Sequence, residues 1–150
     1  MDNACNFFNS INKKNEFVDK NLYNISPLNL AYLGDAIFEV LVRDKVLKDS
    51  KTSVNKLNSK AKSFVNAKAQ CEMYYKIINF LSEEEYSIMK RGRNTKSISK
   101  AKNATIVEYR HATGLEALFG YLFLKGDNER INFIFEKCII NDEENNDEKK

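Results

Sequence analysis

The sequence has little proline, glycine, cysteine and histidine, and each shortage excludes a class of protein. One Pro and five Gly in 150 residues are too few for the many tight turns of an all-β sandwich or barrel. Three Cys without a CxxC pair predict neither a disulfide framework nor a cysteine zinc site, and they fit a reducing cytosol. The single His, His111, argues against histidine metal sites and a Ser–His–Asp triad, so any hydrolytic chemistry has to depend on carboxylates.

Long apolar runs and glycine-rich phosphate loops are also missing. The longest run of apolar residues and Gly, Ala117 to Leu124, is far shorter than the ~20 residues that span a bilayer. Residues 1–17 have no apolar core behind a basic start, so we expect no secretory signal. Neither GxGxxG nor GxxxxGK[ST] occurs. We therefore expect a cytoplasmic protein with no membrane partner and no nucleotide cofactor.

Positive charge is concentrated in the middle of the chain. The net charge is only +3, but residues 43–102 hold 15 basic side chains against 6 acidic ones. Within this stretch, residues 90–102 (KRGRNTKSISKAK) have six cations and no acid. Such a concentration is the electrostatic footprint of a polyanion partner. The alternative is a solvated, lysine-rich surface, because the chain as a whole holds 19 Lys and 19 Asn.

Apolar residues recur at helical spacing along most of the chain, and no segment shows the period-2 alternation of a strand. N-terminal signals precede four of the five apolar stretches: Ser26-Pro27, Thr52-Ser53, Ser82 and Asp127. The predicted helices cover about 28–47, 53–77, 83–91, 105–125 and 129–140. We predict one all-α domain over residues 25–140, with a loose N-terminal arm (1–24) and an acidic, disordered tail (141–150).

Two acidic residues lie inside otherwise apolar helical stretches, where a carboxylate is costly to bury. Asp35 lies in LAYLGDAIFEVLV (30–42) and Glu116 in ATGLEALFGYLFL (112–124). Small residues beside both acids let the helices approach closely and bring the acids together: Gly34, Gly114 and Gly120. Two carboxylates with no Cys or His nearby suit a hard cation with oxygen ligands, usually Mg²⁺. The alternative is a pair of buried acids satisfied by Ser, Thr or Tyr hydroxyls.

Two other titratable residues have simpler interpretations. Glu39 follows Asp35 by about one helical turn, so it could support Asp35, but an ion pair with Arg43 one turn further on is the interpretation we favour. His111 is expected to be an ordinary helix residue rather than a catalyst.

The residues around the two acids resemble a known family. Leu33-Gly34-Asp35-Ala36, followed by apolar residues, resembles the signature helix of ribonuclease III, and residues 115–120 (LEALFG) resemble its second catalytic helix. The resemblance extends from about Ser26 to Ile140. It is closest for the short Mini-ribonuclease III branch, which has the nuclease domain without a double-stranded-RNA-binding domain. Three motifs favour that branch: NLAYLGD (29–35), KRGRN (90–94) and YRHATG (109–114).

The resemblance implies an all-helical homodimer that cuts double-stranded RNA with Mg²⁺. In the Mini branch it further implies trimming of the precursor of large-subunit (23S) ribosomal RNA. Asp35 matches the signature aspartate and Glu116 the last catalytic glutamate, so both are expected to be catalytic and to bind the metal. The helices over 30–42 and 112–124 are the candidates for the dimer face.

Three acids of full-length ribonuclease III are replaced in this chain. Leu28 and Ala31 occupy the positions of two upstream acids, and Thr113 occupies that of the acid three residues before Glu116. The Mini branch resembles this sequence in these reductions, so we do not interpret them as inactivation, and we expect waters to complete the metal's ligands. The alternatives are a non-catalytic RNA-binding, ribosome-assembly module with the same fold, and a purely structural helical dimer.

The basic segment is the expected RNA contact. Phosphate and 2′-OH contacts across the minor groove read the shape of an RNA duplex more than its sequence. We expect these contacts from Arg91, Arg93, Asn94, Lys96, Lys100 and Lys102, with Lys60 and Lys62 as additional candidates.

Overall fold

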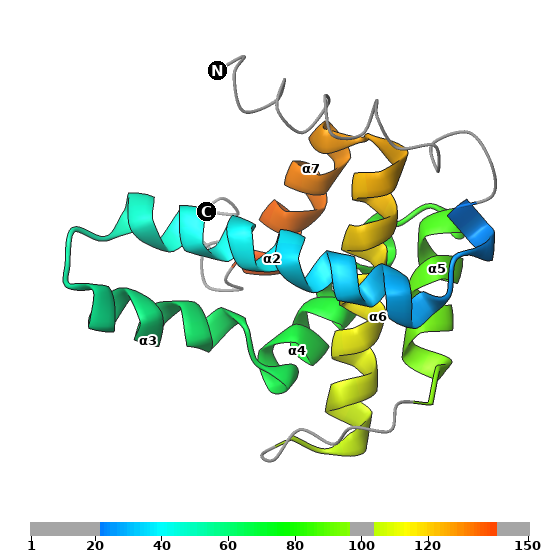
Figure 1. Ribbon diagram of the computed structural model, residues 1–150, viewed down its shortest axis with the longest axis horizontal. Coiled ribbons are helices and arrows are strands. Elements are labelled where there is room, and N and C mark those ends of the chain that lie inside the picture. Colours follow the sequence, from blue (N-terminus) through cyan, green and yellow to red (C-terminus); the bar gives the residue numbers. More distant parts are fainter. Residues whose placement is uncertain (1–21, 97–103, 141–150) are drawn as a thin grey trace, which may run out of the picture.

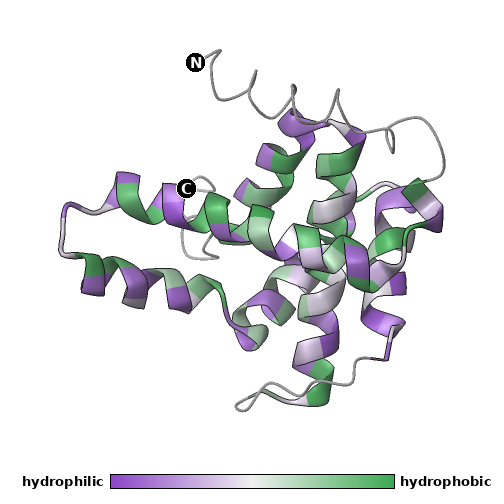
Figure 2. Cartoon of the chain, in the orientation of Figure 1, coloured by the Kyte–Doolittle hydropathy of each residue, from purple (hydrophilic) through white to green (hydrophobic). Residues whose placement is uncertain are grey.

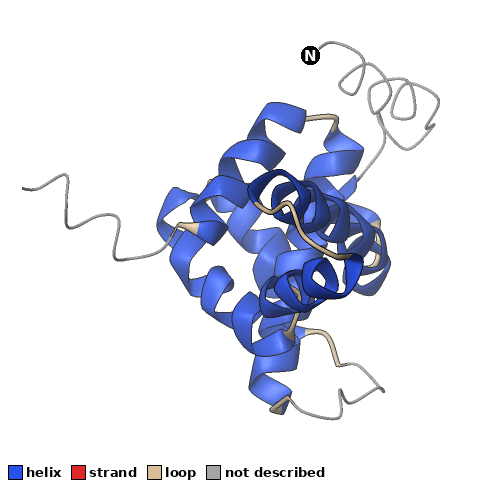
Figure 3. Ribbon diagram, turned by 90° about the vertical axis from the view of Figure 1, so that its left-hand side faces the viewer, coloured by secondary structure: helices blue, strands red, loops and turns tan. Residues whose placement is uncertain are grey.

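The computed structural model describes residues 22–96 and 104–140, and every regular element in this part is a helix (Figures 1 and 3). The predicted all-α fold is therefore confirmed. The arm and the tail lie outside the described residues, except that Leu22–Asn24 form a short 3₁₀ helix, η2. The other elements are α2 (Pro27–Asp49), α3 (Val54–Phe64), α4 (Ala67–Ile77), η3 (Ile78–Phe80), α5 (Glu83–Asn94), α6 (Ile106–Lys125) and α7 (Asn128–Ile139).

Helix α6 lies at the centre of the fold. Thr105 and Glu108 form a capping box at its start, and Gly126, at φ 78°, ends it in the left-handed conformation. Every residue from His111 to Leu124 except Glu116 is buried, because α2, α4 and α5 all pack around this helix. The expectation that residues 112–124 offer a dimer face is therefore wrong. These apolar side chains form the core of a single chain.

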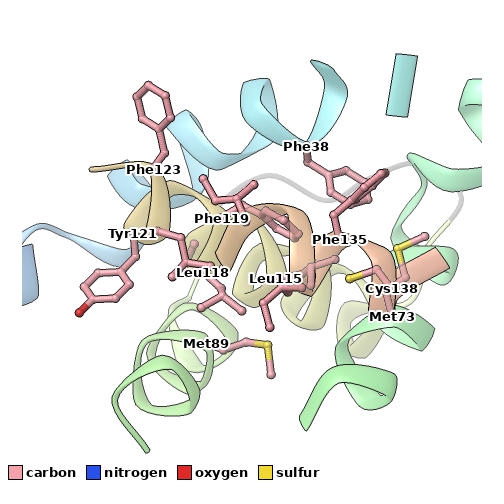
Figure 4. Packing of buried hydrophobic residues seen from close by; sticks show 14 of the residues in the cluster. Phe38, Met73, Met89, Leu115, Leu118, Phe119, Tyr121, Phe123, Phe135 and Cys138 are labelled. Atoms are coloured by element: carbon pink, nitrogen blue, oxygen red, sulfur yellow. The ribbon is translucent and has the colours of Figure 1, made fainter. Parts of the chain in front are cut away.

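Aromatic side chains join three of the helices in the core. The Phe38 ring of α2 lies 5.5 Å from the ring of Phe119 in α6 and 5.8 Å from that of Phe135 in α7, measured between centroids (Figure 4). Offset and edge-on contacts of this kind add to the stabilisation that comes from burial. They hold α2 and α7 on the same side of α6.

The predicted long second helix is wrong, because the chain breaks between α3 and α4. Asn66 has extended backbone angles, and its side-chain oxygen accepts from Ala69 N at 2.8 Å, while its amide donates to Lys62 O at 2.8 Å. One side chain thus ends α3 and caps α4. Hydrophobic and hydrophilic residues alternate along α3 (Figure 2), and apolar residues continue across the break, which is why periodicity alone hid it.

The predicted end of the third helix at Arg91-Gly92 is also wrong, because α5 continues to Asn94. Gly92 is a packing residue and not a helix end. A Cβ there would lie 2.9 Å from both Gly114 Cα and the Ala117 side chain. Gly114 likewise faces α5, since its Cβ would lie 2.6 Å from Met89 O. Gly114 therefore serves the contact between α5 and α6 and not the approach of α2.

In the part of the chain that the structure describes, no helix is long and apolar enough to cross a membrane.

Candidate active site

Helix α2 crosses α6 in close contact (Figure 1). The two acids come together at this crossing. A Cβ on Gly34 would lie 1.6 Å from Glu116 O, and a Cβ on Gly120 would lie 2.0 Å from Leu30 O. The two backbones are therefore in contact, as only glycine allows. Gly34 contacts the backbone carbonyl of Glu116, and Asp35 is the next residue after Gly34. Both acids therefore lie beside the point where the two helices cross.

Both carboxylates line one pocket of about 470 Å³. Its wall is built from α2, from the junction between α3 and α4, from α4 and from the first half of α6. The lining residues are Asp35, Val65, Asn66, Ala67, Lys68, Gln70, Ala104, Tyr109, Ala112, Thr113 and Glu116. The predicted meeting of Asp35 and Glu116 in one site is thus observed, and the pocket joins three segments that are distant in sequence.

The pocket is unfavourable for negative charge. Burial, and then the neighbouring Asp35 carboxylate, raise the pKa of Glu116 to about 8, while a hydrogen bond from Gln70 acts in the opposite direction. Burial and then the Glu39 carboxylate raise the pKa of Asp35 above its usual range. Among the described residues neither acid has an ion-pair partner. Lys68 lines the same pocket, but no described cation pairs with either carboxylate to stabilise its ionised form.

The donor set fits a hard divalent cation. Both ligands are carboxylate oxygens, and oxygen ligands with several retained waters are typical of Mg²⁺. No three His, Cys, Asp or Glu side chains within residues 22–96 and 104–140 lie together as a metal cage. Among the described residues that line the pocket, Asp35 and Glu116 are the only acids. A cation there would offset the repulsion that raises the pKa of Glu116.

We expect Glu116→Gln to stabilise the metal-free protein at alkaline pH. The folded protein holds the Glu116 proton up to a pKa of about 8, whereas the unfolded chain releases it near 4.5. Between these values the folded state binds more protons, so the free energy of unfolding falls as pH rises. Glutamine remains neutral, so the variant should gain about 4 kcal/mol at pH 8 and less than about 1 kcal/mol at pH 5.

Urea unfolding in EDTA at both pH values measures this difference. Glu136→Gln, an exposed change on α7, serves as the matched control. If the variant is less stable than wild type at pH 8, the charge of Glu116 does not destabilise the folded protein.

Residues near the acids have defined partners. Glu39 accepts from Arg43 Nε at 2.9 Å, which confirms the predicted ion pair. Thr113 is buried in the pocket wall, and its hydroxyl donates to Tyr109 O of its own helix at 3.0 Å. His111 is buried against the rings of Tyr74 and Tyr75, and its Nε2 lies 2.9 Å from the Tyr75 hydroxyl.

The residues predicted to bind RNA lie in different environments. Arg91 stacks over the Tyr23 ring, and its guanidinium donates to Tyr23 O at 2.8 Å. Arg93 donates to the Tyr74 hydroxyl at 3.3 Å and to Asn94 Oδ1 at 3.1 Å. Asn94 and Lys96 are exposed. Lys100 and Lys102 lie outside the described residues. Of the two additional candidates, Lys60 donates to Ser50 Oγ at 2.6 Å, and Lys62 is exposed.

Sequence reasoning missed the contribution of α4 to the site. Gln70, Asn66 and Lys68 all line the pocket, and Gln70 contacts Glu116 directly. The only signal in the sequence was Asn66, a strong helix N-cap in the middle of an apolar pattern. Nothing in the spacing of Gln70 distinguished it from a surface glutamine.

The ribonuclease III domain family model matches residues 28–127, so the chain belongs to this family. The matched range includes both carboxylates and the pocket around them. The chain is an endoribonuclease of the ribonuclease III class.

Several relatives are named Mini-ribonuclease 3, which is a narrower class than the whole family. The chain is 46% identical over 127 residues to Mini-ribonuclease 3 of Clostridium tetani, covering 84% of this chain and 83% of the relative. It is 47% identical over 121 residues to Mini-ribonuclease 3 of Brevibacillus brevis, covering 81% and 89%. A crystal structure of a Fusobacterium nucleatum protein superimposes with a TM-score of 0.74 at 39% identity, covering 81% of this chain and 98% of that one.

Proposed function

We propose that this chain cleaves double-stranded RNA with Mg²⁺, using Asp35 and Glu116 as the metal-binding and catalytic pair. The observation that carries the proposal is the shared pocket, in which two carboxylates from crossing helices lack a described ion-pair partner. The resemblance to the Mini branch supports the precursor of large-subunit (23S) ribosomal RNA as the natural substrate.

The chemistry follows from the charges at this site. Mg²⁺ supplies Lewis acidity, which makes water more acidic and offsets negative charge on a phosphate. Asp35 and Glu116 would hold the cation in their shared pocket through their two negative charges. Lys68, a cation that lines the same pocket, offers a positive charge for a phosphate. Hydrolysis of the P–O3′ bond leaves a 3′-hydroxyl and a 5′-phosphate.

Cleavage of a fully paired RNA duplex tests this function. We expect cuts in Mg²⁺, none in EDTA, and cleavage of a transcript that folds the ends of the 23S precursor into their stem. Duplex binding that persists in EDTA, with no cleavage in Mg²⁺ or Mn²⁺, would instead support the non-catalytic assembly module.

The basic residues at the end of α5 and directly after it are proposed to bind phosphates. Replacing Arg93 and Lys96 by Ala should weaken binding about equally for all duplex sequences. Each lost phosphate contact should flatten the plot of log affinity against log salt by nearly ~1 unit. The cleavage rate at saturating RNA should change much less, because neither residue lines the pocket.

Lys125→Ala is the matched control, since Lys125 lies 3.9 Å from Glu84 in the first turn of α5, at the end of that helix opposite Arg93. Filter binding at several salt concentrations measures both slopes. Equal slopes for the variant and wild type would show that this segment does not hold phosphates.

We also propose a homodimer formed through α2. This helix leaves an apolar face uncovered: Leu28, Tyr32, Val40 and Leu47 are exposed, and Tyr32 is 85% exposed. Apolar side chains at this helical spacing are typical of an interface. Tyr32→Glu should therefore give a monomer in light scattering at micromolar concentration. The protein with Val54→Glu, an exposed change on α3 and not on α2, should remain dimeric. A wild-type chain that is monomeric would contradict the proposal.

A further inference from the structure

Gln70 contacts a proposed catalytic carboxylate from a third helix. Its side chain is 4% exposed, and its Nε2 donates to Glu116 Oε1 at 3.2 Å. We propose that Gln70 is a positioning residue, which holds one oxygen of Glu116 and leaves the other oxygen to the metal ion. This inference depends on the proposed function, in which Glu116 is a metal ligand.

The side chain of Gln70 suits this role because it is a hydrogen-bond donor without a charge. A carboxylate only accepts hydrogen bonds, so a buried carboxylate beside α4 needs a donor. An Arg or Lys at this position would form an ion pair with Glu116 and cancel the charge that attracts a cation. The neutral amide donates one hydrogen bond and leaves both negative charges of the site in place. Its hydrogen bond also favours the ionised form of Glu116, in the direction that metal binding requires.

The packing of α4 holds Gln70 in place. Tyr74 lies four residues after Gln70, on the same face of the helix, and is fully buried. A Cβ on Gly114 would lie 3.1 Å from the Tyr74 ring, so α4 rests directly on α6 at this point. Gln70 lies one turn earlier on the same face of α4, where it contacts Glu116.

The break at Asn66 makes this contact available. Because Asn66 ends α3 and starts α4, the chain turns before Gln70, and α4 packs on α6 while α3 packs mainly on α2. Figure 1 shows the change of direction between the two helices. Asn66 itself lines the same pocket. The cap at Asn66 therefore sets the direction of α4, and with it the position of the Gln70 amide.

A purely structural role for Gln70 makes a different prediction. In that case the amide needs only some partner for its buried polar atoms, and its loss lowers stability without changing metal affinity. Positioning residues behind a metal ligand change metal affinity by ~10-fold to 100-fold when they are removed.

Mg²⁺ titration calorimetry of the metal-free protein separates these two roles. Gln70→Met keeps the length of the side chain and removes the donor, so we expect its Kd for Mg²⁺ to rise about tenfold or more. Gln70→Asn keeps an amide on a side chain one methylene shorter, so it should also bind Mg²⁺ more weakly. Met73→Leu, a buried change of similar volume on the same helix, should leave the Kd unchanged.

Kinetics provide a second readout. The half-saturating Mg²⁺ concentration for cleavage should rise in both Gln70 variants, while the KM for duplex RNA changes less than about twofold, because the amide contacts the carboxylate and not the RNA. Gln70 variants that bind Mg²⁺ as tightly as wild type would overturn the inference. Glu116→Gln, titrated alongside, should lose Mg²⁺ binding. If it binds Mg²⁺ normally, the proposed metal site fails, whatever Gln70 does.

Discussion

Asp35→Asn is expected to lower the rate of duplex RNA cleavage by about 10³-fold or more, which corresponds to about 4 kcal/mol of lost transition-state stabilisation. Asparagine keeps the size of the side chain and one carbonyl oxygen, but it removes the charge that holds the cation. The fold should be unaffected, because burial already raises the pKa of Asp35 and a neutral side chain relieves that cost. Duplex binding in EDTA should remain close to wild type.

Asp44→Asn is the matched control for this experiment. Asp44 lies on the same helix and pairs with Lys48 at 2.9 Å, away from the pocket. Its loss should leave the cleavage rate unchanged, because an exposed ion pair contributes little. If Asp35→Asn cleaves at nearly the wild-type rate, Asp35 is not a metal ligand and the proposed site is wrong.

Gly34→Ala is expected to destabilise the protein by about 3 kcal/mol or more, or to prevent folding. Its Cβ would lie 1.6 Å from Glu116 O and 2.8 Å from Gly120 N, and both of these atoms belong to backbone that cannot rotate away. The helices would have to separate, and α6 would carry Glu116 away from Asp35. Any folded fraction should therefore lose cleavage as well as stability. Urea unfolding and the duplex assay measure the two effects.

Gly126→Ala gives the comparison for a local effect. Gly126 lies at φ 78° beyond the end of α6, so alanine there costs about 1 kcal/mol of strain without moving α2 against α6. Its cleavage rate should match that of wild type. A Gly34→Ala protein with wild-type stability and rate would show that the two helices do not need their backbone contact.

The sequence predicted the starts of α5 and α7 from the residues that cap them. Ser82 forms a capping box with Glu85, and Asp127 accepts from Arg130 N. The capping box of Thr105 with Glu108 at the start of α6 was not among the predicted signals. Prediction failed at Asn66, because an apolar pattern continues through the cap, and at Gly92. Glycine close to a helix end suggests termination, but Gly92 is needed for contact with Gly114 on another helix. Such a contact depends on tertiary packing.

The candidate site divides in the same way. Asp35 and Glu116 were predictable, because a carboxylate inside an apolar helix beside glycine is costly and needs a reason. Gln70 was not, since its role depends on how α4 crosses α6. The engagement of Arg91 with Tyr23 was equally hidden, because these two residues are 68 positions apart. The run of basic residues in the sequence identified Arg91 as a cation, but it gave no sign of the contact with Tyr23.

Anomalous diffraction from crystals of this protein grown with Mn²⁺ tests the central claim most directly. Mn²⁺ takes the same oxygen ligands as Mg²⁺ and can be located by its own scattering. The account predicts a peak in the pocket, bonded to carboxylate oxygens of both Asp35 and Glu116. No peak at saturating Mn²⁺, or a peak that contacts neither carboxylate, would contradict it.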